Sequence, residues 1–331
     1  MKIALVTGAS SGLGREFVRQ IAEQGKVEEI WAIARRRDRL EALQSISAVP
    51  IRVLALDLTR PGDMEYLRNT LQDELPDIRI LVNAAGMGRM GPTVDIPAKD
   101  NDAMIDLNCR AAVDVTDAAF PYLHPGSQVL EICSTAGFQP IPGLNVYAAT
   151  KAFLLSYTQT LHYELSPAGI HVTAVCPYWV KDTEFIGIAE KGGHGFRHYP
   201  LASRSQDVVR RALRDSALNL RVSTPGLVCT LHRAAAKVTP NLLCLPLADW
   251  LSHVCPSLTI RRNPLWKSTN TSAPNAAASS MNRTGCRPPV GTSPKCLTSR
   301  TKSSSPSAAA TAATPSCTAR PAAKAGICWT F

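Results

Sequence analysis

The sequence predicts a single α/β domain with a doubly wound parallel sheet, followed by a disordered tail. Short apolar runs rich in β-branched residues alternate with segments of helical period, which favours right-handed crossovers and a parallel sheet covered on both faces. The composition then changes sharply near residue 255. The expected strands are residues 3–6, 29–34, 51–56, 78–82, 128–133 and 171–176.

The helical segments between these runs have clear ends. The first places apolar residues on one stripe and stops at Gly25, a residue suited to a helix C-terminus. A long helix is expected from about Val146 to Ser166, and another over 205–220, before a break at 223–226. The stripe of the first helix consists of Leu13, Phe17, Val18, Ile21 and Ala22.

Residues 256–331 differ from the rest of the chain. They contain no Asp or Glu and hold ten of the 36 Lys and Arg residues, so residues 1–255 carry 26 basic and 26 acidic residues. Ser, Thr, Ala and Pro dominate, and such a segment cannot bury enough apolar surface to offset its ordering entropy. We therefore predict a domain over 1–255 and a disordered basic tail. The tail is either a real low-complexity extension or, as its composition favours, a frameshift product.

Composition also excludes several classes of protein. The pI of about 9.2 comes from the tail, so nucleic-acid binding is not expected of residues 1–255. Ten cysteines without a CxxC pair indicate neither a zinc site nor a disulfide framework. The opening MKIALVTG predicts a strand and a turn without a secretory leader, which favours the cytoplasm. The apolar stretch 242–251 is shorter than the roughly 20 residues that cross a bilayer.

A glycine-rich turn follows the first expected strand. Glycines there let the backbone approach a pyrophosphate, which then rests on the amides and the positive dipole end of the next helix. A purely structural turn is the alternative, but the strand–turn–helix context favours dinucleotide binding in a Rossmann-type domain. The pattern TGxxxGxG comprises Thr7, Gly8, Ser10, Ser11, Gly12, Leu13 and Gly14.

The residues after the second expected strand indicate which dinucleotide binds. An acidic residue there binds the ribose 2′-hydroxyl, whereas a basic one accommodates a 2′-phosphate. Arg35, Arg36 and Arg37 follow this strand, while Glu28 and Glu29 lie at its other end. We expect NADP(H), with NAD(H) as the alternative, and Arg35 as the phosphate contact. Arg37 fits an exposed helix start equally well.

Tyr147 and Lys151 are four residues apart and so share one face of the long helix. The pair alone is uninformative, but Ser134 ends a strand 13 residues earlier and Asn108 precedes it in a helix. A tyrosine pKa near 10 must fall by about three units, or roughly 4 kcal/mol, for a base at pH 7. An adjacent ammonium and a positive nicotinamide ring can supply that stabilisation.

Together these motifs resemble the short-chain dehydrogenase/reductase family over about residues 1–230. The resemblance implies that Tyr147 is the general acid in reduction and the base in oxidation, that Ser134 orients the carbonyl or alcohol, and that Lys151 lowers the tyrosine pKa and holds the nicotinamide ribose. Asn108 would anchor a water of a proton relay. The matching segments are TGASSGLG at 7–14, Asp57 in LDLT, NAAG at 83–86, Asn108 in DLN, Ser134, and YAATK at 147–151.

The resemblance also implies further cofactor contacts and the reaction. Asp57 would contact the adenine, and the NAAG segment would support the sheet beside the cofactor. Hydride would pass between C4 of the nicotinamide and a carbonyl carbon, without a metal. The remaining expected cofactor residues are Asn83, Ala84, Gly86, Pro177 and Val180.

The loop after the sixth expected strand departs from the family pattern. The family has Pro-Gly and then a threonine that binds the carboxamide, whereas here Tyr178 follows Pro177 and Thr183 lies one place late. Tyr178 either lines the nicotinamide pocket or simply packs, and the role of Thr183 is open. Residues 184–201 follow this loop and are expected to form a substrate lid. Their histidines and glycines could instead indicate metal or phosphate binding, but they lack ligand spacing and acidic neighbours, which favours a flexible lid.

The sequence thus predicts an NADP(H)-dependent oxidoreductase acting on a ketone, an aldehyde or the corresponding alcohol. A hydroxysteroid or 3-oxoacyl reductase is the narrower alternative. A catalytically idle dinucleotide-binding sensor is the alternative from another class, although the complete set of four polar residues argues against it. The resemblance implies a homodimer or homotetramer, and no residue identifies the substrate.

Overall fold

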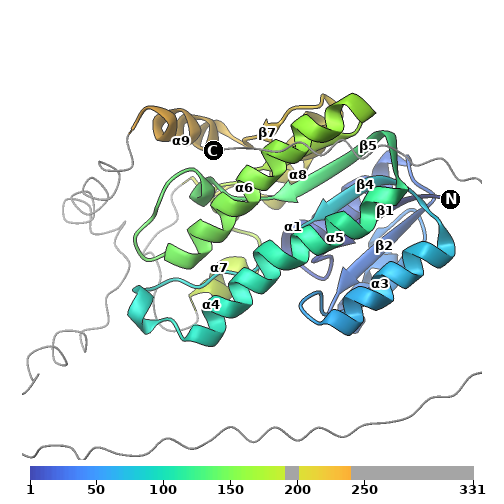
Figure 1. Cartoon of the computed structure of the whole chain (residues 1–331), viewed down its shortest axis with the longest axis horizontal. Helices are drawn as coiled ribbons and strands as arrows, with labels where there is room; N and C mark the ends of the chain where they lie inside the picture. Colours follow the sequence, from blue (N-terminus) through green and yellow to red (C-terminus); the bar gives the residue numbers. More distant parts are fainter. Residues whose placement is uncertain (191–200, 240–331) are drawn as a thin grey trace, which may run out of the picture. The chain divides into compact units, whose positions relative to one another are not determined.

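Seven parallel strands form the centre of the fold (Figure 1). The structure is a computed structural model that describes residues 1–190 and 201–239, all within one compact unit. The strand order is β3-β2-β1-β4-β5-β6-β7. The strands are β1 (Lys2–Thr7), β2 (Glu29–Ala34), β3 (Ile51–Ala55), β4 (Asp77–Asn83), β5 (Leu123–Ile132), β6 (His171–Val175) and β7 (Val222–Ser223).

Helices cover both faces of this sheet, so the predicted doubly wound α/β fold is confirmed (Figure 1). Helices α3, α5 and α6 pack on one face, and α1 and α8 pack on the other. The helices are α1 (Gly12–Gln24), α2 (Arg37–Glu41), α3 (Pro61–Glu74), α4 (Ala98–Ile105), α5 (Ala111–Ala119), α6 (Asn145–Leu165), α7 (Phe185–Ala189), α8 (Ser205–Ala217) and α9 (Leu227–Val238).

The boundaries follow local chemistry. Helix α1 buries Phe17, Val18 and Ile21 and ends at Gly25, whose φ of 61° is left-handed. The prediction for α8 was three residues too long, because Asn219 turns the chain with a φ of 54°. Strand β7 was missed, since the sequence there indicated a break. It is only two residues long and is identified by its pairing with β6.

The order of the strands places a crevice at the carboxyl ends of the central strands. Strand β1 pairs with β2 on one side and with β4 on the other, so the direction of winding reverses at β1. In open parallel sheets, ligands bind outside the carboxyl ends of the strands at such a point. The turns after β1, β4 and β5 therefore meet around one crevice.

Several predictions fall outside the residues that the structure describes. These are the domain boundary after residue 255, the tail and the stretch 242–251. Residues 191–200 of the expected lid also lie outside, so only residues 184–190, which include α7, and Leu201 are described. No helix within 1–190 or 201–239 combines the length and the apolar character that a membrane span requires.

Candidate active site

A cavity of about 870 Å³ opens at the carboxyl ends of the strands. It is lined by residues from the glycine turn, from the ends of β2 to β5 and from the start of α6. Thr7, Asn83 and Asn108 do not line it but lie directly behind its wall. The predicted site residues that line it are Gly8, Ser10, Ser11, Gly12, Leu13, Gly14, Arg35, Asp57, Ala84, Gly86, Ser134, Tyr147, Lys151, Pro177 and Val180.

The glycine turn is tight enough to exclude side chains. A Cβ atom on Gly14 would lie 2.3 Å from the carbonyl oxygen of Gly8, and one on Gly8 would lie 2.7 Å from the amide nitrogen of Ala85. The first turn of α1 carries no acidic residue, and Ser11 makes no side-chain capping bond. The amides at this helix start therefore face the cavity without a capping side chain, which fits a pyrophosphate.

Thr7 ties the end of β1 to the loop after β4. Its hydroxyl accepts a hydrogen bond from the Ala85 amide at 3.1 Å and donates to the Val82 carbonyl at 3.4 Å. The side chain is fully buried, so it acts on the shape of the cavity and not on its lining.

Arg36 joins the glycine turn to the loop that precedes α7. Its Nη2 donates to the hydroxyls of Ser10 (3.1 Å) and Ser11 (2.9 Å), and its Nη1 donates to Glu184 Oε2 at 3.0 Å. Arg35, the predicted phosphate contact, also lines the cavity. Sequence reasoning placed Arg36 only within a basic run, and its partner Glu184 was not expected.

Asp57 lines the cavity after β3 and is held there as a carboxylate. Burial raises its pKa, but hydrogen bonds from the Thr59 hydroxyl (2.7 Å) and amide (3.1 Å) lower it, as does the charge of Arg35. The net shift of the Asp57 pKa is downward. The side chain can therefore accept hydrogen bonds from a ligand at neutral pH.

The chemistry-bearing residues meet between β5 and α6. Ser134 follows β5, while Tyr147 and Lys151 lie one turn apart on α6 and are 7% and 5% exposed. The Lys151 ammonium donates to the Ile132 carbonyl at 2.7 Å and lies 5.9 Å from the centre of the Tyr147 ring. The predicted Ser–Tyr–Lys set therefore shares one cavity wall.

Asn108 supports this centre from behind. It lies in a π-helical turn, Asp106–Arg110, and its amide exchanges hydrogen bonds with the Met87 backbone at 2.8 and 2.9 Å. It also donates to the Thr150 hydroxyl at 3.0 Å. A Cβ on Gly86 would lie 3.1 Å from Asn108 Oδ1 and 3.6 Å from Lys151 Nζ, so the three residues are close neighbours.

The protein's own groups do not bring the Tyr147 pKa toward neutrality. Burial, the largest cause, raises the pKa of Tyr147, and the hydrogen bond with Ser134 only partly opposes it. Burial also lowers the pKa of Lys151, while Cys133 and Glu131 raise it. Both groups are thus drawn toward their neutral forms.

Glu131 is a buried acid that sequence reasoning missed. It has no exposed surface, and its Oε1 accepts hydrogen bonds from Asn83 Nδ2 (2.7 Å) and Thr116 Oγ1 (2.9 Å), whereas Oε2 has no partner among the described residues. Burial raises the pKa of Glu131 to about 7, although both hydrogen bonds and Lys151 oppose the shift. The available signal was an acidic residue inside the otherwise apolar run 129–133.

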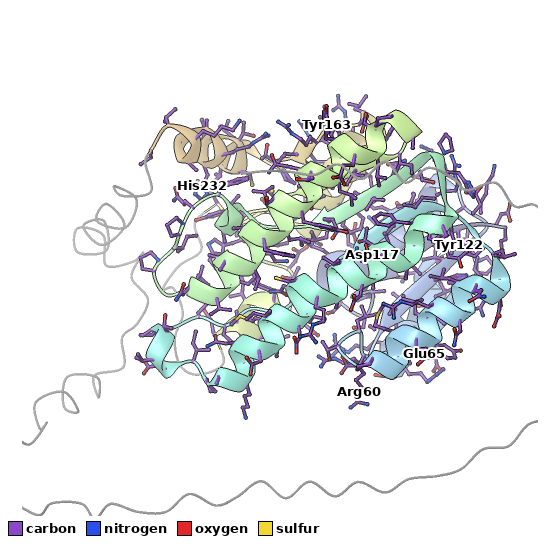
Figure 2. The ribbon with its side chains drawn as sticks, in the orientation of Figure 1. Arg60, Glu65, Asp117, Tyr122, Tyr163 and His232 are labelled. Atoms are coloured by element: carbon purple, nitrogen blue, oxygen red, sulfur yellow. The ribbon has the colours of Figure 1, made fainter. Side chains whose placement is uncertain are left out.

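Beside Tyr147 the cavity has an aromatic wall. Tyr178 and Trp179 lie edge to face at 6.2 Å, and the Phe185 ring lies 5.5 Å from that of Tyr147. His232 joins them from α9 (Figure 2), and no sequence signal had singled it out. Thr183 also lines the cavity, where it packs beside Gly12. Tyr178 thus lines this cavity.

No cluster of three or more metal-ligating side chains occurs in the part of the chain that the structure describes. The cysteines of that part, Cys109, Cys133, Cys176 and Cys229, are free.

Comparison with known proteins identifies the family. The short chain dehydrogenase family matches residues 2–191. The NADP-dependent 3-hydroxy acid dehydrogenase YdfG of Escherichia coli (strain K12) is 34% identical over 196 residues, which cover 58% of this chain and 78% of that protein. An uncharacterized oxidoreductase of Staphylococcus epidermidis is 32% identical over 178 residues, covering 53% of this chain and 76% of that one.

Solved structures agree with this match. A short-chain dehydrogenase from Sphingobium yanoikuyae in complex with NADPH is 32% identical with a TM-score of 0.62, covering 76% of this chain and 96% of that one. The closed form of a serine dehydrogenase complexed with NADP+ is 31% identical with a TM-score of 0.55, covering 67% of this chain and 94% of that one. The chain therefore belongs to the short-chain dehydrogenase/reductase family of NAD(P)-dependent oxidoreductases that act on CH–OH groups.

Proposed function

We propose that this protein is an NADP(H)-dependent oxidoreductase that interconverts a carbonyl compound and the corresponding alcohol, with Tyr147 as the acid/base. The observation that carries the proposal is that Ser134, Tyr147 and Lys151 line the same cavity as the glycine turn and the arginines after β2. Dinucleotide-binding and proton-transfer groups in one cavity are what the reaction needs.

The cavity residues fit a dinucleotide phosphate. The turn at Gly8–Gly14 would receive the pyrophosphate, Asp57 the adenine end, and Arg35 with Arg36 the 2′-phosphate. The Sphingobium yanoikuyae relative is a complex with NADPH, the serine dehydrogenase is a complex with NADP+, and YdfG is NADP-dependent, which supports NADP(H) over NAD(H).

Each residue of the centre has a distinct task in reduction. Bound NADPH supplies a hydride to the carbonyl carbon. The Ser134 hydroxyl donates a hydrogen bond to the carbonyl oxygen and orients it, and the Tyr147 hydroxyl gives that oxygen its proton. Burial keeps Tyr147 protonated at neutral pH, which is the form that donates the proton. The same burial makes it a weaker acid, so Ser134 and the charge of a bound cofactor would have to lower its pKa toward the operating pH.

In oxidation the proton moves the other way, from the alcohol to the Tyr147 oxygen. A phenolate there needs positive charge nearby, which the Lys151 ammonium and the oxidised nicotinamide ring provide. Asn108 fixes the Met87 backbone beside Lys151 and would hold a water that returns the proton to solvent.

A 3-hydroxy acid is the first substrate class to test, because YdfG is a 3-hydroxy acid dehydrogenase. The aromatic wall of Tyr178, Trp179 and Phe185 also suits an apolar ketone, so a hydroxysteroid or 3-oxoacyl substrate is the alternative. A catalytically idle sensor is the less favoured function, since each of Ser134, Tyr147 and Lys151 is in place at the cavity.

Two further expectations accompany the proposal. We expect a homodimer or homotetramer, to be measured by sedimentation. We also place the enzyme in the cytoplasm, because its buried cysteines are unpaired thiols in the described part of the chain.

A carbonyl panel with NADPH consumption tests the function. Tyr147→Phe should lower turnover by at least about 100-fold while NADPH still binds, since general acid catalysis contributes 10²–10⁴-fold. Tyr163→Phe is the matched control, because Tyr163 is on the same helix and 82% exposed. Equal rates in wild type and Tyr147→Phe, or no turnover of any carbonyl, would contradict catalysis and favour the sensor.

A further inference from the structure

We propose that Glu184 competes with the NADP 2′-phosphate for Arg36 and Arg39, and so limits how strongly this enzyme prefers NADP(H) over NAD(H). The inference rests on the proposed NADP(H) function and concerns a residue beyond the predicted cofactor contacts.

The first support is the seating of the Glu184 carboxylate between two guanidinium groups. Its Oε2 accepts from Arg36 at 3.0 Å, and its Oε1 accepts from Arg39. Both arginines lie in the segment after β2, the place where a basic residue accommodates a 2′-phosphate. A carboxylate therefore occupies Arg36, one of the two proposed phosphate donors, together with the neighbouring Arg39.

Arg36 links this carboxylate to the glycine turn. One edge of its guanidinium donates to the Ser10 and Ser11 hydroxyls, and Nη1 donates to Glu184. Both serines and Glu184 contribute to the cavity lining. The Glu184 carboxylate that Arg36 binds thus lies at the cofactor cavity itself.

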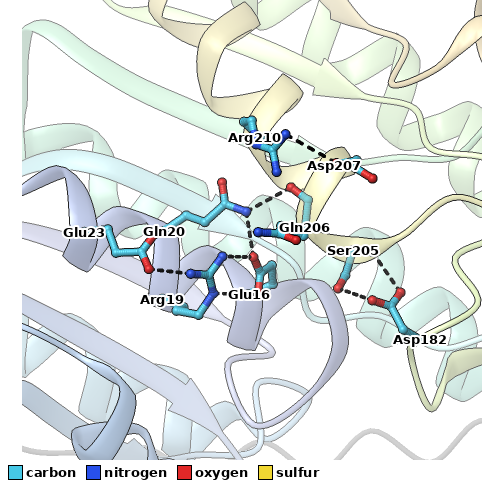
Figure 3. Close-up of polar contacts among 9 residues, drawn as sticks. All are labelled: Glu16, Arg19, Gln20, Glu23, Asp182, Ser205, Gln206, Asp207 and Arg210. Atoms are coloured by element: carbon cyan, nitrogen blue, oxygen red, sulfur yellow. Dashed lines mark hydrogen bonds and ion pairs between the residues drawn. The ribbon is translucent and has the colours of Figure 1, made fainter.

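The chain around Glu184 is anchored, so its position is not that of a freely moving side chain. The Asp182 carboxylate accepts hydrogen bonds from the Ser205 amide (2.8 Å) and hydroxyl (2.7 Å) at the start of α8 (Figure 3). Thr183 then packs next to Gly12, where an added Cβ would lie 3.4 Å from the threonine. These contacts of Asp182 and Thr183 position Glu184 beside the glycine turn.

The carboxylate is charged before a cofactor binds. Hydrogen bonds from Arg39 and Arg36 lower the pKa of Glu184, so it is ionised at neutral pH. A phosphate monoester carries about −1.5 to −2 charges and favours the same bidentate guanidinium donors. NADP(H) must therefore displace or repel Glu184, whereas NAD(H), which lacks the phosphate, can leave both ion pairs intact.

Fluorescence titration of wild type and Glu184→Gln with NADPH and with NADH tests the proposal. Glu184→Gln keeps the shape but removes the charge, and should tighten NADPH binding by about three- to tenfold, the size expected for exposed ion pairs. The affinity for NADH should change less than about twofold. Glu41→Gln is the control, because Glu41 pairs with Arg37 at 3.7 Å on the same helix as Arg39 and does not line the cavity.

The outcomes separate this inference from the proposed function. Weaker or unchanged NADPH binding in Glu184→Gln, or an equal gain for NADH, would overturn the role of Glu184 and leave an NADP(H) enzyme in place. Wild-type protein that binds neither dinucleotide would instead overturn the proposed function, and the competition with it. A gain confined to NADPH and absent in Glu41→Gln supports the competition.

Discussion

Replacing Glu131 with Gln should stabilise the protein increasingly as the pH rises. The folded state holds this carboxyl with a pKa of about 7, against 4.5 when unperturbed, because it is fully buried. Between these values the folded state keeps a proton that the unfolded state has released. The wild-type protein therefore loses stability as the pH rises through this window, while the Gln variant has no such proton to lose.

The size of the effect follows from the shift. About 2.5 pKa units at about 1.4 kcal/mol each correspond to at most about 3.5 kcal/mol, most of which develops between pH 5 and pH 8. The Glu131→Gln variant should gain about 2 to 3 kcal/mol relative to wild type over that range. The comparison cancels titrations that both proteins share.

Urea unfolding of both proteins at pH 5, 6, 7 and 8 measures this difference. Glu164→Gln is the control, because Glu164 is exposed near the end of α6, and its difference from wild type should not vary with pH. A difference between Glu131→Gln and wild type that is constant from pH 5 to pH 8 would refute the reasoning. It would mean that the carboxyl is ionised throughout and stabilised by groups other than those described.

Two further predictions concern the cavity wall. Gly14→Ala should weaken NADPH binding at least about tenfold, because its Cβ would meet the Gly8 carbonyl oxygen. The control Gly62→Ala should bind NADPH normally, because a Cβ there would have nothing within 4 Å. Equal NADPH affinities of the two variants in a titration would contradict this. Asn108→Ala should lower the free energy of unfolding in urea by about 2 to 3 kcal/mol and should lower turnover, because it leaves the Met87 amide and carbonyl without their partner. A loss of stability below about 0.5 kcal/mol would argue against this role of Asn108.

The main strands could be predicted because strands buried on both faces appear as apolar runs. Strand β7 could not, because Val222 and Ser223 form a strand only through their pairing with β6. The segment before α5 was expected to be helical, but nothing in its residues indicated a π-helical turn at Asn108.

The candidate site likewise has a part that could be predicted from the sequence and a part that could not. The glycine turn and the Tyr147–Lys151 spacing are local patterns, so the sequence predicted them and the structure places them at one cavity. Arg36 and Glu184 are 148 residues apart, and their pairing depends on how the loop before α7 lies beside the glycine turn. Likewise, His232 reaches the cavity only because α9 returns to it.

The Lys151 ammonium is held by a main-chain carbonyl, that of Ile132, and Asn108 is likewise bonded to the Met87 backbone. A side-chain substitution at position 132 or 87 leaves these acceptors and donors in place. The proton-transfer centre can therefore tolerate sequence drift around it. The aromatic wall of the cavity is made of side chains such as Trp179 and Phe185, where each substitution changes the shape that a substrate meets. Substitutions in the aromatic wall can thus change the substrate that this enzyme binds and leave its proton-transfer centre unchanged.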